Sequence, residues 1–218
     1  MSTERRPPPF VPSLLHEGRL WSQGYRRIAG LDEAGRGAWA GPVVAAAVIL
    51  PASRPDLLQR LAGVRDSKQL SPARRETLLE AIQTQALTWG VGQVAPAEID
   101  ALGIVPATRQ AMHQALASLS PAADYALIDY LPLPDLDLPQ FSLPKGDVRV
   151  LSIAAASIVA KVIRDQLMVQ LDDRYPGYGF ARHKGYGTPQ HRAALQALGP
   201  CAIHRLSFAP LQQLGTAH

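Results

Sequence analysis

Three aspartates stand at or just after short apolar runs of the chain, namely Asp32, Asp129 and Asp147. In an open α/β sheet, residues in such positions can converge at one edge. Carboxylates that meet there repel one another, and divalent cations would relieve the repulsion; an all-oxygen ligand set selects hard ions such as Mg²⁺ or Mn²⁺. Two such ions, roughly 3.5–4 Å apart, can hold a phosphodiester, activate a water molecule and stabilise the leaving oxygen. The aspartates therefore indicate metal-dependent phosphodiester cleavage.

A fourth acid, Glu33, directly follows Asp32 and precedes the sequence Gly35-Arg36-Gly37. On a regular strand, consecutive side chains point to opposite faces. Both acids can reach one pair of ions only if the strand ends or bends between them; otherwise Glu33 would contribute its backbone carbonyl. Taken singly, an acid at a strand end is more often a turn former or a helix cap. The interpretation therefore depends on the combination and order of the motifs.

The elements that must position these acids follow from the pattern of apolar residues. Strands are expected within residues 28–50 as a hairpin with a glycine-rich link, over 87–95, and over 125–130 ending on Asp129. Helices are expected from Ser71 as N-cap with Pro72 at the first helical position, over 106–119, over 152–171 and near 189–198. Residues 148–151 are expected to form a strand or an extended link, and the proline-rich residues 131–141 a loop or an edge hairpin.

This alternation predicts an α/β fold with a mixed sheet. We expect three parts: a flexible N-terminal arm over residues 1–20, a catalytic domain over 21–172, and a basic helical segment with a tail over 173–218. Asp165 lies four residues after Lys161 in the long helix, which favours an ordinary ion pair on the helix surface.

Composition restricts the class of protein and the kind of partner. The 218 residues are 47% hydrophobic, no apolar run reaches membrane-spanning length, and no hydrophobic signal segment follows the first arginines. The single Cys201 fits a reducing compartment, so a cytoplasmic protein is expected. Residues 174–218 contain five arginines or lysines and no acid, whereas the whole chain has a net charge of only +4. A nearly neutral body with a basic end indicates a polyanionic partner such as nucleic acid.

Several motifs in this order resemble bacterial ribonuclease HII, a type 2 ribonuclease H. They are GLDEAGRGAWAGPVVAAAVIL, DSKQLSP, LIDY, LPKGD, SIAAASIVAKVIRD, YPGYGFARHKGYGT and IHRLSFAP, and they run from about residue 26 to residue 210. The resemblance implies a ribonuclease H-like fold, a five-stranded mixed sheet flanked by helices with a C-terminal helical segment. It also implies cleavage of RNA in RNA–DNA hybrids, and of DNA duplexes 5′ of embedded ribonucleotides, with two Mg²⁺ or Mn²⁺ ions and with 5′-phosphate and 3′-hydroxyl products.

The resemblance also implies roles for individual residues. Asp32, Glu33, Asp129 and Asp147 would be the catalytic metal ligands. The contacts to the substrate would come from a second set: Gly35, Arg36 and Gly37 at the ribose 2′-hydroxyl and adjoining phosphates, Lys68, Lys145 and Lys184 at phosphates, and Tyr186 on the sugar that follows the ribonucleotide. Ser67 and His183 are weaker candidates. A glycine-flanked loop allows close backbone approach, and the 2′-hydroxyl is what distinguishes RNA from DNA.

One departure and two other readings accompany this resemblance. Tyr130 and Leu131 follow Asp129 where the family usually has glycine and often asparagine, so the turn after Asp129 is expected to differ. A hybrid-binding module without catalysis is a second hypothesis, against which the complete set of acids argues. A resolvase or transposase is a third, against which the Gly-Arg-Gly and tyrosine elements argue. Nothing in the sequence requires more than a monomer.

Overall fold

The structure is a computed structural model that describes residues 11–209 and 211–212. The strands are β1 (Ile28–Ala34), β2 (Val43–Ile49), β3 (Thr88–Val94), β4 (Tyr125–Asp129) and β5 (Gln140–Leu143). The α-helices are α1 (Leu15–Ser22), α2 (Leu57–Arg60), α3 (Pro72–Gln85), α4 (Pro96–Leu102), α5 (Ile104–Ala117), α6 (Leu151–Arg174), α7 (Phe180–His183) and α8 (Pro189–Leu198). Two short 3-10 helices are η1 (Ser67–Gln69) and η2 (Gly146–Val148).

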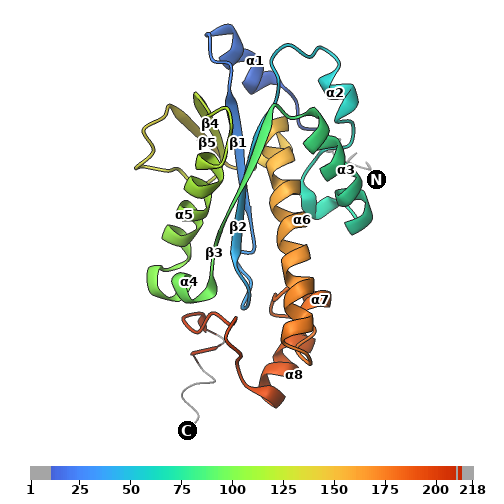
Figure 1. The fold of residues 1–218 in the computed structure, drawn as a ribbon, viewed down its shortest axis with the longest axis vertical. Helices are drawn as coiled ribbons and strands as arrows, with labels where there is room; N and C mark the ends of the chain where they lie inside the picture. Colours follow the sequence, from blue (N-terminus) through green and yellow to red (C-terminus); the bar gives the residue numbers. More distant parts are fainter. Residues whose placement is uncertain (1–10, 210, 213–218) are drawn as a thin grey trace, which may run out of the picture.

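The five strands form one mixed sheet in the order β3-β2-β1-β4-β5. The predicted hairpin is confirmed, because β1 and β2 pair antiparallel from Ala29 opposite Ile49 to Ala34 opposite Val44. β4 lies parallel to β1, and β5 lies parallel to β4. The expected α/β class and five-stranded mixed sheet are therefore confirmed, with β1 in the centre (Figure 1).

Helices cover both faces of this sheet (Figure 1). The alanine-rich side of α6 and the apolar side of α3 share one core with β2, while α5 packs on the other face against β1 and β2. The approach of α6 to β1 depends on Gly30, where an added Cβ would lie 2.2 Å from the Ser152 carbonyl carbon. Only glycine leaves room for this contact, which brings the long helix against the strand that carries Asp32.

The division of the chain differs from the expected one at two places. The boundaries placed after residues 20 and 172 fall inside α1 and α6, each of which continues across them. Within the described residues of the expected arm, the Ser13 carbonyl accepts from the Leu151 amide at 3.1 Å, and the buried Glu17 accepts from the Ser152 amide at 2.9 Å. These bonds satisfy the free amides at the start of α6, so residues 11–20 are attached to the body. Residues 1–10 lie outside the described residues.

Smaller differences have local causes. The proline-rich segment is followed by a parallel edge strand, β5, and no hairpin forms there. In the segment 148–151, expected to be a strand or an extended link, Val148 ends η2, Val150 makes one bridge to Ser13 and Leu151 begins α6. The helix expected at 106–119 begins at Ile104, because a proline in the first helical turn removes no hydrogen bond. The helix starts at Pro72 and Pro189 are confirmed.

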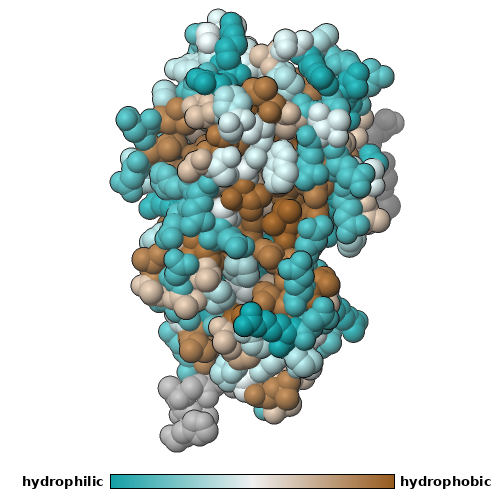
Figure 2. Space-filling model, viewed as in Figure 1, coloured by the Kyte–Doolittle hydropathy of each residue, from teal (hydrophilic) through white to brown (hydrophobic). Residues whose placement is uncertain are grey.

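The C-terminal segment extends the long axis of the molecule (Figure 1). A separate small core joins the end of α6 with α7 and α8 through Met168, Phe180 and Leu195. Hydrophilic residues cover most of the face seen in Figure 2, and apolar residues gather near its middle. Within the part of the chain that is described, no helix combines the length and hydropathy needed to cross a bilayer.

Candidate active site

Three carboxylates meet where β1 extends beyond the end of β4. Asp32 lies in β1, Asp129 is the last residue of β4, and Asp147 lies in η2. One carboxylate oxygen of each lies within 4.8 Å of those of the other two. The pairing explains this convergence, since Leu31 is opposite Ile128 in the parallel ladder and each is followed by an aspartate. The expected grouping of the three aspartates is thus present in the structure.

The loop that carries Asp147 is tied to the end of β4. The amide of Gly146 donates to Asp129 Oδ1 at 2.7 Å, and an added Cβ on Gly146 would lie 2.7 Å from Ile153 Cδ1. The glycine therefore lets the loop sit between the start of α6 and Asp129. The Asp32 carboxylate is held in a similar way, because the amide of Glu33 donates to its Oδ1 at 2.7 Å.

Glu33 occupies a different position from the three aspartates. The strand does not end or bend at Asp32, because regular pairing with β2 continues to Ala34 opposite Val44. Glu33 is not part of the group within 4.8 Å, but it lines the same cleft beside Asp129. Its Oε1 accepts from Arg36 at 3.2 Å, and its Oε2 is buried with no hydrogen-bond partner in the described residues. A bound cation would give this buried oxygen the partner that it lacks within the described residues.

The electrostatics of the cluster favour binding of a cation. Burial raises the pKa of Asp32 well above its ordinary value, and the charges of Glu33 and Asp129 raise it further. Burial is also the first cause of the raised pKa values of Asp129 and Asp147. Burial acts to lower the pKa of Lys68, but the nearby carboxylates, Asp32 foremost, outweigh it and the net shift is upward. An exposed ammonium 3.8 Å from Asp147 Oδ2 is a weak counter-charge for several buried acids.

This donor set fits divalent metal ions. It consists of carboxylate oxygens without sulfur or imidazole, which suits Mg²⁺ or Mn²⁺ better than Zn²⁺ or copper. Uncompensated buried charge is costly, and a bound cation would remove the cost. The residues present are therefore suited to the metal ions that the sequence predicts.

The acids lie at the junction of two sections of one cleft. One section is lined by Asp32, the loop Gly35–Gly37 and Tyr186, and the other by Tyr130, Lys145 and Asp147. Glu33, Arg36, Lys68 and Asp129 line both sections. The cleft thus brings together ten of the eleven predicted site residues.

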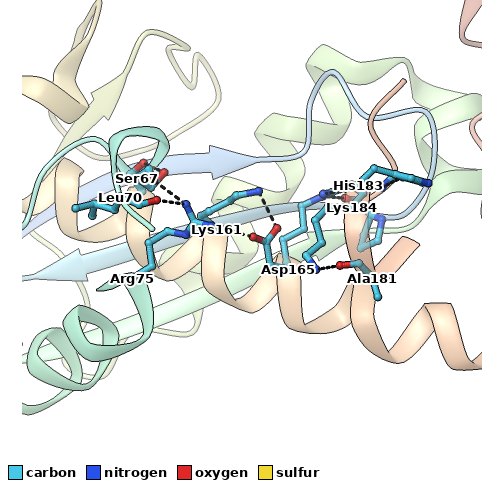
Figure 3. Close-up of polar contacts among 12 residues, drawn as sticks. Ser67, Leu70, Arg75, Lys161, Asp165, Ala181, His183 and Lys184 are labelled. Carbon is cyan, nitrogen blue, oxygen red and sulfur yellow. Dashed lines mark hydrogen bonds and ion pairs between the residues drawn. The ribbon is translucent and has the colours of Figure 1, made fainter. Parts of the chain in front are cut away.

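Lys184 is the exception. It lines a separate hollow beside Arg75 and Asp165, and its ammonium donates to the Ala181 carbonyl. Figure 3 shows this side chain directed toward Ala181. The backbone of Lys184 still contributes locally, because its carbonyl accepts from Arg164 at 2.9 Å.

The glycine-rich loop is held by two buried arginines. Arg164 of α6 donates to the carbonyls of Ala40, Pro42 and Lys184, and Arg205 donates to those of Arg36 and Gly41. The loop also pairs with the segment before Tyr186, since the Trp39 amide donates to the Gly185 carbonyl at 2.8 Å. Five carbonyls that would otherwise lack donors are satisfied in this way.

Tyr186 is placed by charged neighbours from α6. Its ring centre lies 5.5 Å from Lys161 Nζ and 5.4 Å from the guanidinium carbon of Arg164. Asp165 accepts from Lys161 at 2.7 Å and lies 3.5 Å from Arg75 (Figure 3). The predicted pair of Asp165 with Lys161 is present, and it also steadies an amine at the tyrosine.

The two weaker candidates differ in their surroundings. Ser67 lines the cleft, and its hydroxyl lies 3.0 Å from that of Ser157, itself beside Asp32. His183 is buried, with Nε2 2.8 Å from the Tyr178 carbonyl. Its ring is therefore committed to the small C-terminal core.

A model of the family described as Ribonuclease HII matches residues 29–211. The chain belongs to the ribonuclease HII family. A ribonuclease HII from Synechococcus sp. (strain JA-3-3Ab) is 56% identical over 93% of this chain and 90% of its own length. Another from Chloroflexus aurantiacus is 55% identical over 93% of this chain and 95% of its own length. The recognition made from the motifs is confirmed.

The fold agrees with that assignment. The crystal structure of the ribonuclease H2 from Pyrococcus horikoshii OT3 superposes with a TM-score of 0.72 at 26% identity, covering 86% of this chain and 96% of that one. This member of the ribonuclease HII family is therefore a metal-dependent endoribonuclease of the ribonuclease H type, a hydrolase acting on RNA–DNA hybrids.

Sequence reasoning missed several residues of the enzyme's cleft. Asp66, Ser157, Lys161 and Arg149 line it, and none was assigned a role there. Asp66 begins the DSKQLSP motif, and Ser157 lies four residues before Lys161 in the SIAAASIVAKVIRD motif. Membership of a motif was the available signal for both of them, whereas Arg149 stands at the end of η2 without any such signal.

Proposed function

We propose that this enzyme hydrolyses the RNA strand of RNA–DNA hybrids and cuts DNA duplexes on the 5′ side of embedded ribonucleotides, leaving 5′-phosphate and 3′-hydroxyl ends. The observation that carries the proposal is the group of Asp32, Asp129 and Asp147, within 4.8 Å of one another, at the junction of a cleft lined by basic and aromatic residues. The substrate would lie along the cleft with its scissile phosphate over the three acids.

The metal ligands would be the three aspartates together with Glu33, and two Mg²⁺ or Mn²⁺ ions would occupy the site. The unpartnered Oε2 of Glu33 and the upward pKa shifts caused first by burial support this assignment. When bound, a metal pair supplies an activated water and stabilises charge on the leaving oxygen. The protein's own part is to hold four carboxylates in one place before the substrate arrives.

Recognition of the ribonucleotide would fall to the section of the cleft beside Asp32. Gly35, Arg36 and Gly37 would contact the 2′-hydroxyl and adjoining phosphates, with Arg36 oriented by its pair with Glu33 at 3.2 Å. Tyr186 would pack on the sugar that follows, because an aromatic ring with a phenol offers both an apolar face and a hydrogen bond.

Phosphate contacts would come from lysines at the rim. Lys68 and Lys145 line the cleft beside the acids. Lys184 would reach the duplex only after its ammonium leaves the Ala181 carbonyl. The lack of acids over residues 174–218 supports this use of the C-terminal segment as a binding surface. We propose that the enzyme acts as a monomer in the cytoplasm.

The test uses an end-labelled DNA duplex with one ribonucleotide, with and without Mg²⁺ or Mn²⁺. We expect metal-dependent cleavage 5′ of the ribonucleotide, loss of cleavage in Asp32→Asn with binding retained, and full activity in Asp137→Asn, which alters an exposed acid outside the cleft. Cleavage of long hybrids alone would remove ribonucleotide recognition from Arg36 and Tyr186. Binding of both substrates without cleavage of either would favour the hybrid-binding module, and retained cleavage by Asp32→Asn would refute the metal site.

A further inference from the structure

Tyr130 has an unusual backbone conformation directly beside Asp129. Among the described residues other than glycine, only three have a positive φ: Tyr130 at 58°, Lys145 at 57° and Lys184 at 53°. A bulky residue in this region is rare and is disfavoured by contact of its Cβ with the backbone. All three positions lie in motifs around the active site, where such strain tends to gather.

The surrounding backbone holds Tyr130 in this conformation. Its amide donates to the Leu143 carbonyl at 3.1 Å, and the amide of Leu131 donates back to the Asp129 carbonyl at 2.6 Å. Leu131 itself is buried. The chain therefore turns sharply between a carboxylate of the acid cluster and a core leucine, and the turn presents the side chain of Tyr130 outward.

The ring of Tyr130 is not packed in any of the apolar cores of the described residues. Tyr130 is 62% exposed, compared with 48% for Phe141. It lines the section of the cleft that also holds Arg36, Lys68 and Lys145. Tyr186 lines the other section, with Asp32 and Lys161. The two tyrosines thus belong to different sections that meet at the acids.

We propose that Tyr130 is a further substrate-contacting residue, whose ring is a stacking surface for a nucleotide on the side of the scissile phosphate away from Tyr186. An exposed aromatic ring among cationic side chains suits a nucleic-acid strand, because the ring can stack on a base or sugar while the cations contact the phosphates. The inference rests on the proposed function, since it needs a duplex lying along both sections of the cleft.

The test separates the ring from the backbone conformation with three variants. Tyr130→Gly removes the ring and relieves the positive φ, Tyr130→Ala removes the ring but keeps the disfavoured φ, and Tyr130→Phe keeps a ring. We expect Tyr130→Gly to unfold at or above the wild-type temperature. Both ring-deleted variants should bind an RNA–DNA hybrid roughly 5- to 150-fold more weakly, the range expected for one stacked base. Their kcat at saturating hybrid should stay close to that of wild type, and Tyr130→Phe should behave as wild type.

A second measurement locates the nucleotide. Hybrids are shortened one nucleotide at a time on either side of the cleaved phosphate, and the KM of wild type is divided by that of Tyr130→Gly. The ratio should return to one when the stacked nucleotide is removed, and it should do so on one side only. A stable Tyr130→Gly variant with wild-type KM on all hybrids would overturn the inference while the proposed function stood. If Tyr130→Ala alone were impaired, the backbone and not the ring would matter, which would also overturn it. A wild-type enzyme that cleaves no hybrid would instead refute the proposed function.

Discussion

Gly35→Ala should destabilise the enzyme far more than the same change two residues away. Gly35 has a φ of +93°, and an added Cβ there would lie 1.9 Å from Arg164 Nε. Gly37 in the same loop has an open surrounding, with nothing within 4 Å of an added Cβ, and its φ is not positive. The two substitutions therefore share chemistry and loop but differ in backbone conformation and in space.

The expected magnitude is the sum of two contributions. A residue with a side chain in the left-handed region costs about 1–2 kcal/mol. Arg164 is fully buried and its Nε donates to the Pro42 carbonyl at 2.9 Å, so it must give up that bond to make room. A hydrogen bond from a charged group contributes about 1.5–3 kcal/mol. Gly35→Ala should thus lose about 2.5–5 kcal/mol of unfolding free energy, whereas Gly37→Ala should stay within about 1 kcal/mol of wild type.

Thermal and urea unfolding measure the difference. For a chain of this size, each kcal/mol lowers Tm by about 2–4 °C, so Gly35→Ala should unfold roughly 5–20 °C below wild type. In an Arg164→Met background the additional cost of Gly35→Ala should shrink to the backbone contribution. Equal stabilities of Gly35→Ala and Gly37→Ala would refute the reasoning, because they would show that Arg164 yields its position without cost.

Three further predictions concern pH, sugar recognition and salt. Burial lowers the pKa of His191 from 6.5 to about 4. Between these two pH values the imidazole is therefore protonated in the unfolded chain but neutral in the folded protein. Stability should therefore fall by up to about 3 kcal/mol as pH drops from 6.5 to 4, and urea unfolding of His191→Gln should show a flatter pH dependence. Tyr186→Ala should weaken cleavage at a single embedded ribonucleotide more than cleavage of a long hybrid, and equal losses in the two assays would argue against a role at the junction. Hybrid affinity should fall steeply with salt, and Lys145→Gln should reduce the slope of log Kd against log salt by about 1.

The acids were predictable because each ends or follows an apolar run. Asp32 and Asp129 stand at matched positions in adjacent parallel strands, so their convergence follows from topology. The rule that consecutive strand residues diverge was a poorer guide for Glu33. β4 ends at Asp129, so the part of β1 beyond it has no neighbour on that side, and Glu33 lines the cleft without any bend in β1.

The burial of Arg164 and Arg205 had no signal in the sequence. Periodicity places Arg164 on a helix, where an arginine is normally exposed, and Arg205 lies in an irregular segment. Both have no exposed surface, because backbone carbonyls from distant loops surround their guanidinium groups. This burial lowers the pKa of Arg205 to about 9. The bond from Arg164 to the Ala40 carbonyl joins residues 124 positions apart in the chain. Local sequence patterns do not predict contacts of this range.

These arginines connect the two parts of the proposed recognition site. Asp32, Glu33 and Asp129 lie on β1 and β4 of the sheet, whereas Arg36 and Tyr186 lie on irregular segments outside it. Arg164 bonds to both segments at once, through the Pro42 carbonyl on one side and the Lys184 carbonyl on the other. Its planar fork of donors can satisfy several carbonyls in fixed directions, which a lysine ammonium does less well. Together with the bond from the Trp39 amide to the Gly185 carbonyl, Arg164 therefore fixes the geometry between the loop and the tyrosine that are proposed to recognise the ribonucleotide, and it does so without needing to touch the substrate.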